Sequence, residues 1–453
     1  MKRAFLICMI CSCVTQLQAQ FFSEEVKHLY QLAEAKNDTL QLYNIQKAQT
    51  GIDIQSTKFN YLPKIGFQAT YTRLNDDIVF PQDMQQLLMG TQALLAKEKL
   101  GLGFNTALPG NVPLKPVPAI QEKDILKTTV NGQWLLFSGL KVSNGVKAYQ
   151  HQEKVFSHLS ESKQAKLWLE ISDLYDKMAL LKEADNIIAS SESFLNEQGR
   201  FVSEAIKNGL ATPLERKRIE LAQQKLEVKK MENNNSKTLL INKLHEVTGA
   251  PTEDLASLQP KIQPVLLTSA PATEQKAEIR ALNEGIQATM YQEKAALAEY
   301  VPKVAAFGQY EMRDKDLSLL DPKWFAGVRL QWNIFDGLAA KNNAKKVALQ
   351  RQALQVQKKS AEDAIELGQK KFREDYLLAS QKVHLKQAEI KLTEDTYDFV
   401  NKQYRNGLSK LTDVLDAIND IEKARFDKQQ ALYEQRRAAL QAADVNGTLL
   451  KNL

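Results

Sequence analysis

The chain has 453 residues, which is enough for two or three ordinary domains or for one extended domain. Charged residues make up 25% of it, while Gly and Pro are sparse at 19 and 13 residues. This composition is typical of long helices rather than of a compact α/β enzyme. The net charge of +6 is small for this length, and basic and acidic residues are interleaved, so nucleic acid is not expected as a partner.

Residues 1–19 are predicted to be a cleaved export signal. A positive start is followed by an apolar core at Ala4–Val14, and cleavage is expected after Ala19. A second interpretation is open, because "ICSC" weakly resembles a lipoprotein signal that would leave Cys13 as a lipidated N-terminus. No other stretch approaches eighteen apolar residues, so the exported protein is expected to be secreted, periplasmic or an outer-membrane barrel. The three cysteines of the chain lie in this segment, at Cys8, Cys11 and Cys13.

Short motifs occur twice in the same order along the chain. "QWLLFSG" ends at Gly139 and "QWNIFDG" ends at Gly337, and an "NGL" motif follows each of them, with its glycine at Gly209 or Gly407. In both copies 70 residues separate the two glycines. Intervals of identical length in the two copies indicate a duplicated unit whose two long segments must stay in register.

The first repeat, 20–250, is predicted to contain a helix, a β-hairpin within 64–138 and two long helices within 140–249. We expect a loop insertion at the hairpin tip, Val79–Lys123, because this stretch contains five prolines and has no counterpart in the second copy. The expected elements are a helix at Ser23–Asn60 with an interruption at Lys36–Thr39, strands at Lys64–Arg73 and Thr128–Phe137, and helices at Lys141–Lys207 and Ala211–Thr248.

A Pro-rich linker at 251–272 precedes the second repeat, 273–453. This repeat is predicted to contain a helix, a β-hairpin within 303–335 and long helices within 338–447. The expected elements are a helix at Glu274–Glu299, strands at Lys303–Arg313 and Lys323–Phe335, and helices at Ala339–Tyr404 and Lys410–Leu440.

The predicted strands alternate apolar and polar residues with a period of two. In the last one, Val328, Leu330, Trp332 and Ile334 would share one face. Strands of about ten residues with aromatic ends suit a tilted membrane strand, although the edge of a soluble β-sandwich alternates in the same way. Four strands are too few to close a barrel, so strands in a membrane would require the protein to oligomerise.

The long helices would each reach roughly 100 Å at 1.5 Å per residue. Apolar residues, among them Trp168, Ile171 and Tyr175, recur at three and four positions in a broad stripe, which favours packing against several neighbours. A two-stranded coiled coil is the alternative. Gly209 and Gly407 suit a left-handed turn, so each long helix is expected to turn back there as a helical hairpin.

Motifs for catalysis, for metal binding and for cofactor binding are not found. The five histidines are scattered, and HExxH, GxGxxG, GxxxxGK[ST] and GxSxG do not occur. We therefore expect neither an enzyme nor a bound metal or cofactor.

The export signal and the duplicated motifs together resemble the TolC-like outer membrane efflux proteins, or outer membrane factors. The resemblance covers the mature chain through "YLPK/YVPK", "QWLLFSG/QWNIFDG" and "NGLATPLE/NGLSKLTDVLDA". It implies a mainly α protein with a membrane β-barrel portion. Three protomers would each give four strands to a twelve-stranded barrel, continued by a long periplasmic α-helical barrel, with the linker in an equatorial region.

The function that the resemblance implies is a passive exit duct in the outer membrane of a Gram-negative bacterium. It would serve a tripartite efflux or type I secretion system, together with a periplasmic adaptor and an inner-membrane transporter of the RND, ABC or MFS type. An exported coiled-coil scaffold or an adaptor without channel activity is the alternative. No motif indicates the exported substrate.

The resemblance also implies roles for particular residues at the helical tips and at the membrane. Asp413 and Asp416 match a pore constriction, although Asp413 in the first turn of a helix would also complement its dipole. The other matched positions are the aperture lock at Tyr404, Glu215 and Lys410, the adaptor-docking tips at Asn208, Gly209, Leu210, Asn406, Gly407 and Leu408, and the membrane-interface anchors Trp134 and Trp332.

Overall fold

The computed structural model describes residues 22–265, 267, 275–313 and 323–451. The predicted export signal and part of the Pro-rich linker lie outside these residues. The chain divides into two compact units, each of which takes segments from both predicted repeats. The helical unit comprises 1–51, 149–289 and 349–453, and the sheet unit comprises 52–148 and 290–348.

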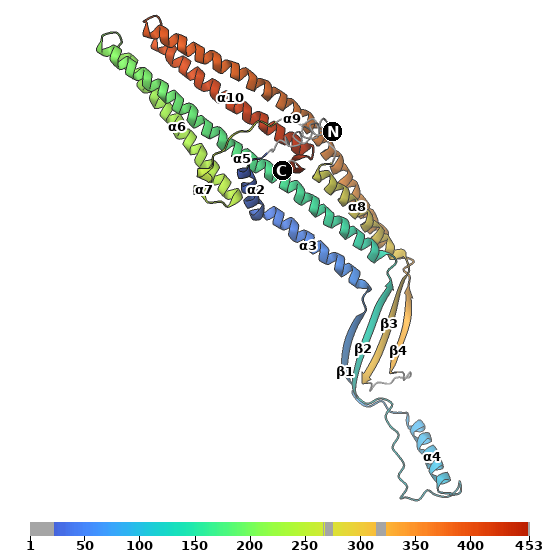
Figure 1. Ribbon diagram of the computed structural model, residues 1–453. Helices are drawn as coiled ribbons and strands as arrows, with labels where there is room; N and C mark the ends of the chain where they lie inside the picture. The colour runs from blue at the N-terminus through green and yellow to red at the C-terminus, as the bar shows by residue number, and fades with distance from the viewer. Residues whose placement is uncertain (1–21, 266, 268–274, 314–322, 452–453) are drawn as a thin grey trace, which may run out of the picture. The chain divides into compact units, whose positions relative to one another are not determined.

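The elements follow the same order in both repeats (Figure 1). The first has α2 (Glu24–Lys36), α3 (Asp38–Lys58), η1 (Phe59–Tyr61), β1 (Lys64–Arg73), α4 (Gln82–Lys99), β2 (Asp124–Phe137), α5 (Lys141–Lys207) and α6 (Pro213–Thr248). After α7 (Thr252–Ser257), the second has α8 (Ala277–Leu297), η2 (Ala298–Tyr300), β3 (Lys303–Arg313), β4 (Trp324–Gln331), α9 (Ala339–Arg405), α10 (Leu411–Val445) and η3 (Leu449–Lys451).

The predicted long helices are confirmed. The helices α5 and α9 each have 67 residues, as the equal intervals in the sequence required. The interruption expected near residue 37 is also present, because Asn37 ends α2 and its side-chain Oδ1 accepts the backbone N–H of Leu40. None of the helices in the described ranges is long and apolar enough to cross a membrane.

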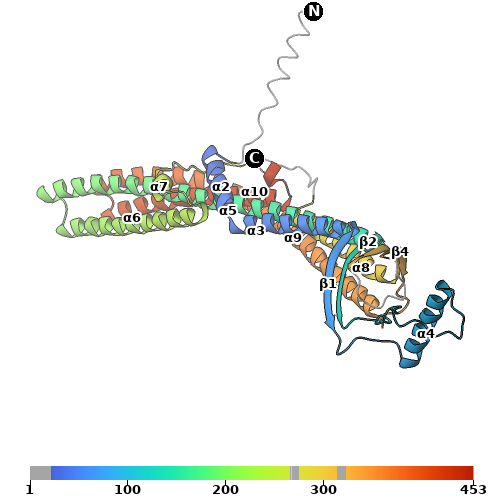
Figure 2. The same ribbon diagram turned by 90° about the horizontal axis from the view of Figure 1, so that it is seen from below.

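In the helical unit, α5 with α6 and α9 with α10 form two hairpins that lie side by side (Figures 1 and 2). The predicted stripe on α5 is buried: Trp168 stacks on Tyr30 of α2 with ring centroids 4.0 Å apart, and Phe22 packs 4.7 Å away. The same apolar cluster includes residues of α6 and α10. The stripe therefore packs against several helices, and the two-stranded coiled coil is wrong.

A buried ion pair joins the two hairpins and the linker. The Arg436 Nε of α10 donates to Asp176 Oδ2 of α5 at 2.7 Å, and Arg436 Nη1 donates to the Gln263 carbonyl at 3.1 Å. Both charged side chains are only 3% exposed. Burial raises the pKa of Asp176 to about 6, against the opposing effect of Arg436. Removal of one partner would leave a buried unpaired charge, which costs about 3–5 kcal/mol.

The sheet unit contains an antiparallel sheet of four strands in the order β1-β2-β3-β4, within the part of the chain described. In register, Phe67 of β1 lies opposite Val130 of β2, which in turn lies opposite Tyr310 of β3, and Tyr310 pairs with Trp324 of β4. Paired residues of an antiparallel sheet point to the same side. We call this side the apolar face; it also carries Ile65, Tyr71, Trp134, Ala306, Val328 and Leu330.

The opposite side of the sheet, the polar face, is rich in charged and amide side chains. Lys127 forms an ion pair with Glu311 on the neighbouring strand at 3.2 Å. The Arg329 guanidinium lies 5.0 Å from the centre of the Phe307 ring, so the aromatic side chain there is covered by a cation. The alternation predicted from sequence therefore gives one apolar side and one polar side.

Two strand boundaries and one loop differ from the sequence prediction. The strand expected at Lys323–Phe335 ends at Gln331, because its neighbour β3 begins at Lys303 opposite Gln331 and offers no partner further on. The strand β2 begins four residues earlier than expected, because Asp124 to Lys127 pair with the end of β1 at Arg73. The insertion at 79–123 is more than a loop, since it contains the 18-residue helix α4.

The duplicated motifs form the junction between strand and helix, and they meet in the same way in both repeats. The Trp134 indole N–H donates to the Tyr61 carbonyl at 2.8 Å, and the Trp332 indole N–H donates to the Tyr300 carbonyl at 2.9 Å. Each tyrosine begins a "YLPK" or "YVPK" motif, so the repeated tyrosine and tryptophan are partners in the fold. Sequence reasoning noted both motifs but did not pair them.

The sixth residue of each "QW" motif takes part in two further hydrogen bonds at this junction. Ser138 Oγ accepts the Val142 backbone N–H and lies 2.8 Å from the Tyr61 hydroxyl. Asp336 accepts the Ala340 backbone N–H at 2.8 Å and the Tyr300 hydroxyl at 2.9 Å. Ser and Asp are both suited to hold free N–H groups at a helix start, which explains why either residue serves here.

The glycine that ends each motif differs in its surroundings between the two copies. Gly139 and Gly337 both have a left-handed backbone, with φ of 64° and 68°. A Cβ at Gly139 would lie 2.9 Å from the Val301 Cβ, whereas one at Gly337 would meet nothing within 4 Å. A substitution at Gly337 therefore adds backbone strain alone, whereas one at Gly139 adds both backbone strain and a steric clash with Val301.

We predict that Gly337→Ala lowers the free energy of unfolding by about 1–2 kcal/mol through backbone strain alone. Gly139→Ala should lose about 1–3 kcal/mol more, because its methyl group is also overpacked. Thermal unfolding in detergent, followed by circular dichroism, compares the two variants. Equal losses would contradict the contact of Gly139 with Val301.

Candidate functional site at the helical tips

Each helical hairpin turns through a motif that the "NGL" sequence predicts. The Gly209 N–H donates to the Ile206 carbonyl and the Leu210 N–H to the Ala205 carbonyl. Gly407 and Leu408 make the corresponding bonds to Tyr404 and Gln403 in the second hairpin. Both glycines have positive φ, of 72° and 74°, as this helix ending requires. The turns leave Leu210 and Leu408 exposed, by 82% and 75%.

A carboxylate holds the start of each returning helix. Glu215 Oε2 accepts the Thr212 backbone N–H at 3.0 Å at the start of α6. Asp413 Oδ2 accepts the Lys410 backbone N–H at 3.1 Å and the Ser409 hydroxyl at 2.7 Å at the start of α10. The hydrogen bond from Ser409 and, to a smaller extent, that from Lys410 lower the pKa of Asp413, so the carboxylate stays charged. Asp413 thus has a helix-capping role.

Of the three residues expected to lock the aperture, two meet within one protomer. The Tyr404 hydroxyl of α9 donates to Glu215 Oε1 of α6 at 3.4 Å. Burial and the negative charge of Glu215 raise the pKa of Tyr404 to about 12, so the hydroxyl keeps its proton and remains a donor. Lys410, the third residue, gives its backbone N–H to Asp413 instead.

Other contacts that the sequence did not reveal join the two hairpins near the tips. Arg405 of α9 forms an ion pair with Glu197 of α5 and lies over the Phe201 ring at 5.3 Å. The buried Gln198 amide donates to Asn401 Oδ1 at 2.9 Å and to the Tyr397 hydroxyl at 3.4 Å. Below the turns, the hairpins share an apolar cluster of Ile188, Leu195, Val202, Ile219, Leu226, Tyr397, Tyr404, Leu411, Val414, Ala417, Ile418 and Ile421.

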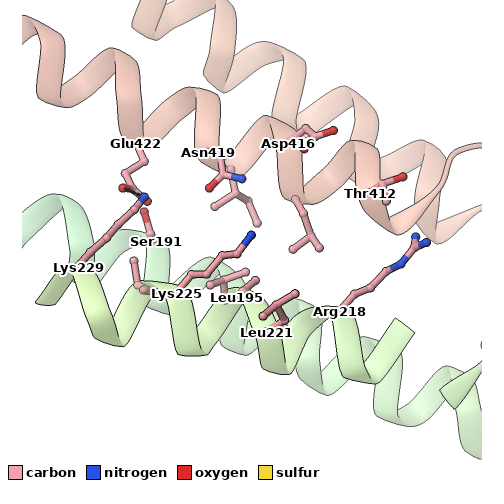
Figure 3. A pocket seen from close by; sticks show the side chains of 14 residues that line it. Ser191, Leu195, Arg218, Leu221, Lys225, Lys229, Thr412, Asp416, Asn419 and Glu422 are labelled. Atoms are coloured by element: carbon pink, nitrogen blue, oxygen red, sulfur yellow. Dashed lines mark hydrogen bonds and ion pairs between the residues drawn. The ribbon is translucent and has the colours of Figure 1, made fainter. Parts of the chain in front are cut away.

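Asp416 lines a groove of about 370 Å³ between α6 and α10. Figure 3 shows Arg218 and Lys225 extending from α6 toward α10, on which Asp416 lies. Deeper in the groove, Lys229 forms an ion pair with Glu422. The groove is therefore lined by acidic residues of α10 and basic residues of α6, and Asp416 belongs to this mixed-charge lining.

The row of cations on α6 could have been found in the sequence. Arg218, Lys225 and Lys229 are separated by seven and four residues, which places them on one side of a helix. That this side faces α10 could not be predicted, because the pairing of hairpins depends on tertiary packing.

The predicted membrane-interface residues lie at the ends of β2 and β4. Trp134 is within β2 and Trp332 is one residue beyond β4. The two residues are 49% and 57% exposed, although both indole N–H groups are bonded to carbonyls. Such a side chain, apolar on its surface and satisfied at its polar atom, suits a position at the edge of an apolar layer.

Groups of His, Cys, Asp or Glu that could hold a metal ion do not occur among the described residues. No protein-family model matches the chain, and no curated protein matches it.

Solved structures match the chain over nearly its whole length. The outer membrane protein VceC from Vibrio cholerae is 15% identical with a TM-score of 0.72, and the match covers 93% of this chain and 96% of that one. CusC, described in terms of transmembrane channel formation, is 14% identical with a TM-score of 0.74 over 95% and 94% of the two chains. The Campylobacter jejuni outer membrane channel CmeC is 16% identical with a TM-score of 0.71 over 95% and 87%. The chain therefore has the fold of these outer membrane channel proteins, and the resemblance to TolC-like outer membrane factors is confirmed at the level of the fold.

Proposed function

We propose that the protein is an outer-membrane exit channel rather than an enzyme. The apolar face of the sheet is the observation that carries this proposal. Its side chains align across all four strands, yet they are exposed: Ile65 by 76%, Phe67 by 65%, Val328 by 68% and Leu330 by 66%. An apolar surface of this extent is costly in water and is the surface that a membrane strand turns toward lipid.

The open sheet provides the argument for a homotrimer. Strands β1 and β4 each have a neighbour on one side only within the described chain, so their outer edges carry unpaired N–H and carbonyl groups. Such edges are not tolerated in lipid, and closure requires strands from other protomers. Three protomers would supply twelve strands, with the polar faces around the channel. The likeness to CmeC supports a channel, because that structure is described as an outer membrane channel.

The helical hairpins would continue this channel into the periplasm and close it at their tips. In the resting state, the Tyr404–Glu215 hydrogen bond and the Arg405–Glu197 ion pair hold the α9–α10 hairpin against the α5–α6 hairpin. Each bond is partly solvated and weak, so their loss requires little free energy. Docking of another protein could therefore shift the equilibrium toward an open aperture.

The turns are the surface that we assign to a periplasmic adaptor, which would link the channel to an inner-membrane transporter. The two tips, Asn208–Leu210 and Asn406–Leu408, have the same backbone and both present an exposed leucine. Each protomer has two such exposed leucines, so a trimer would present six similar docking positions. The energy for transport would come from the transporter, since the channel is passive.

An exported scaffold without channel activity is the competing function. It would also have long helices, but it would need to bury the apolar face of the sheet in a soluble core. Ile65 and Phe67 are instead exposed, as is every residue of β1.

Cell fractionation tests the proposal directly. We predict that the protein is found in the outer membrane and runs in gel electrophoresis as a trimer that heating converts to a monomer. A shift of the band on heating reports a closed β-barrel between protomers, since a barrel leaves no edge to open. Recovery as a soluble periplasmic protein would support the scaffold instead.

Replacement of Tyr404 by Phe together with Glu215 by Ala should raise the single-channel conductance in planar lipid bilayers several-fold, because it removes the bond that joins the hairpins at the tip. Tyr397→Phe is the matched control: this tyrosine lies in the same apolar cluster, and when its hydroxyl is lost Gln198 still joins the hairpins through its shorter bond to Asn401. If the double variant conducts like the wild type, the lock does not exist.

Replacement of Asp413 and Asp416 by Asn should reduce cation selectivity, since carboxylate rings in a narrow pore attract cations. The measurement is the reversal potential in a salt gradient. Glu220→Gln with Glu227→Gln is the control, because it removes two carboxylates from the groove between α5 and α6. An equal shift in both variants would exclude a constriction at Asp413 and Asp416.

A further inference from the structure

The insertion between β1 and β2 contains an amphipathic helix whose apolar side is exposed. No residue of α4 is buried. Met84, Leu87, Leu94 and Leu95 have exposed fractions of 45%, 64%, 41% and 60%. With Leu88 and Thr91 they recur at intervals of three and four, so they form one stripe along the helix, which we call the α4 stripe.

The polar side of α4 is the side that contacts the rest of the insertion. Gln85, Gln92 and Lys97 are partly buried. The Gln85 amide donates to the Phe80 carbonyl at 2.6 Å, and the Lys97 ammonium donates to the Phe104 carbonyl at 3.2 Å. A helix at the surface of a soluble protein turns the other way, with its apolar side inward. No described part of the chain covers the α4 stripe, and a helix from another protomer would bury it.

We propose that the α4 stripe packs against the same stripe of the two other protomers, forming a three-helix cap over the outer mouth of the channel. This inference rests on the proposed trimeric channel. Its partner is a second copy of this chain, and the surface that it uses is the row from Met84 to Leu95.

The place of the insertion in the sheet brings three copies of α4 to one rim. It leaves the sheet after Arg73 and returns at Asp124, which are paired, and the two connecting segments stay joined by the Ile78–Gln121 bridge. When three such sheets close into one barrel, the three insertions surround the same opening. The cap is therefore continuous with the interface that closes the sheet edges.

The dimensions allow the three helices to meet. Twelve tilted strands with a spacing of about 4.8 Å give a barrel of about 12 Å radius. The connector of eight residues between β1 and α4 can span up to about 26 Å. Each α4 can therefore reach the barrel axis, and a helix of 18 residues is about 27 Å long, enough for a short bundle.

The composition of α4 fits a helical partner better than a lipid surface. Helices that lie on membranes usually carry many Lys and Arg residues on their polar side and aromatic residues on the other. The side of α4 opposite the stripe carries Gln82, Gln85, Gln86 and Gln92 together with Met89, and neither side has an aromatic residue. The spacing of three and four along the stripe is that of a helix bundle.

A cap of this kind would oppose entry from the exterior. The polar face of the sheet leaves an aqueous path through the barrel, and the tips control only its periplasmic end. Three packed α4 helices would obstruct the other end, and a molecule leaving the channel would have to part them. The small area of each stripe makes such opening reversible.

Single cysteines at two positions of α4 test the cap. Thr91→Cys lies in the α4 stripe, and Gln86→Cys lies on the opposite side; both native side chains are exposed. Purified trimers are treated with copper phenanthroline and examined without reductant. We expect covalent dimers for Thr91→Cys in about tenfold excess over Gln86→Cys, because a disulfide needs Cα atoms within about 7 Å.

A third variant controls for accidental collisions. Leu87→Glu with Leu94→Glu, added to Thr91→Cys, puts like charges into the stripe and should abolish cross-linking while the heat-modifiable trimer persists. If Thr91→Cys lowers the yield of trimer, Leu95→Cys provides a second position in the stripe.

Trimers in which Thr91→Cys and Gln86→Cys cross-link equally, or not at all, would overturn the cap and leave the channel intact. Cross-linking that survives the two glutamates would overturn it as well. If the unmodified protein forms no trimer, both the channel and the cap fail, so the two proposals are distinguished by the same gels.

Discussion

The open edges of the four-stranded sheet are the constraint on which the rest of the structure depends. A sheet of four strands with one continuous apolar side has no partner for that side or for its two edge strands within the described chain. Association with other copies in a membrane would satisfy both requirements together. The duplication fits the same need, because two similar hairpins would fit into the regular wall of the proposed barrel.

The junction between strand and helix transmits this regularity to the helical hairpins. In both copies the tyrosine before the first strand of the hairpin makes two hydrogen bonds. Its carbonyl accepts the tryptophan N–H, and its hydroxyl bonds to the residue at the helix start. The two consecutive left-handed residues, Gly139–Leu140 and Gly337–Leu338, have matching φ values in each copy. Because the two turns have the same backbone, α5 and α9 begin equivalently and reach equivalent tips after 67 residues.

The tips combine ordered turns with weak contacts between the hairpins, as the proposed gate would require. Each turn is fixed by backbone hydrogen bonds and a capping carboxylate, so its shape is independent of its neighbours. The bonds between hairpins are long-range, few and partly exposed, as in Tyr404–Glu215 and Arg405–Glu197. The groove beside Asp416 is also lined by basic residues of α6, so its charge cannot be judged from the carboxylates of α10 alone.

The sequence by itself determined the duplicated order of elements, the lengths of the long helices and the glycine turns, because periodicity, helix-ending residues and intervals are local properties. It also placed Tyr404, Glu215 and Asp413 at the tips. The tertiary structure decided where β4 ends, since a strand lasts only as long as its neighbour, and that Lys410 bonds to Asp413 through its backbone. It also revealed that α4 exposes its apolar side, because only packing determines which side of a helix meets the chain.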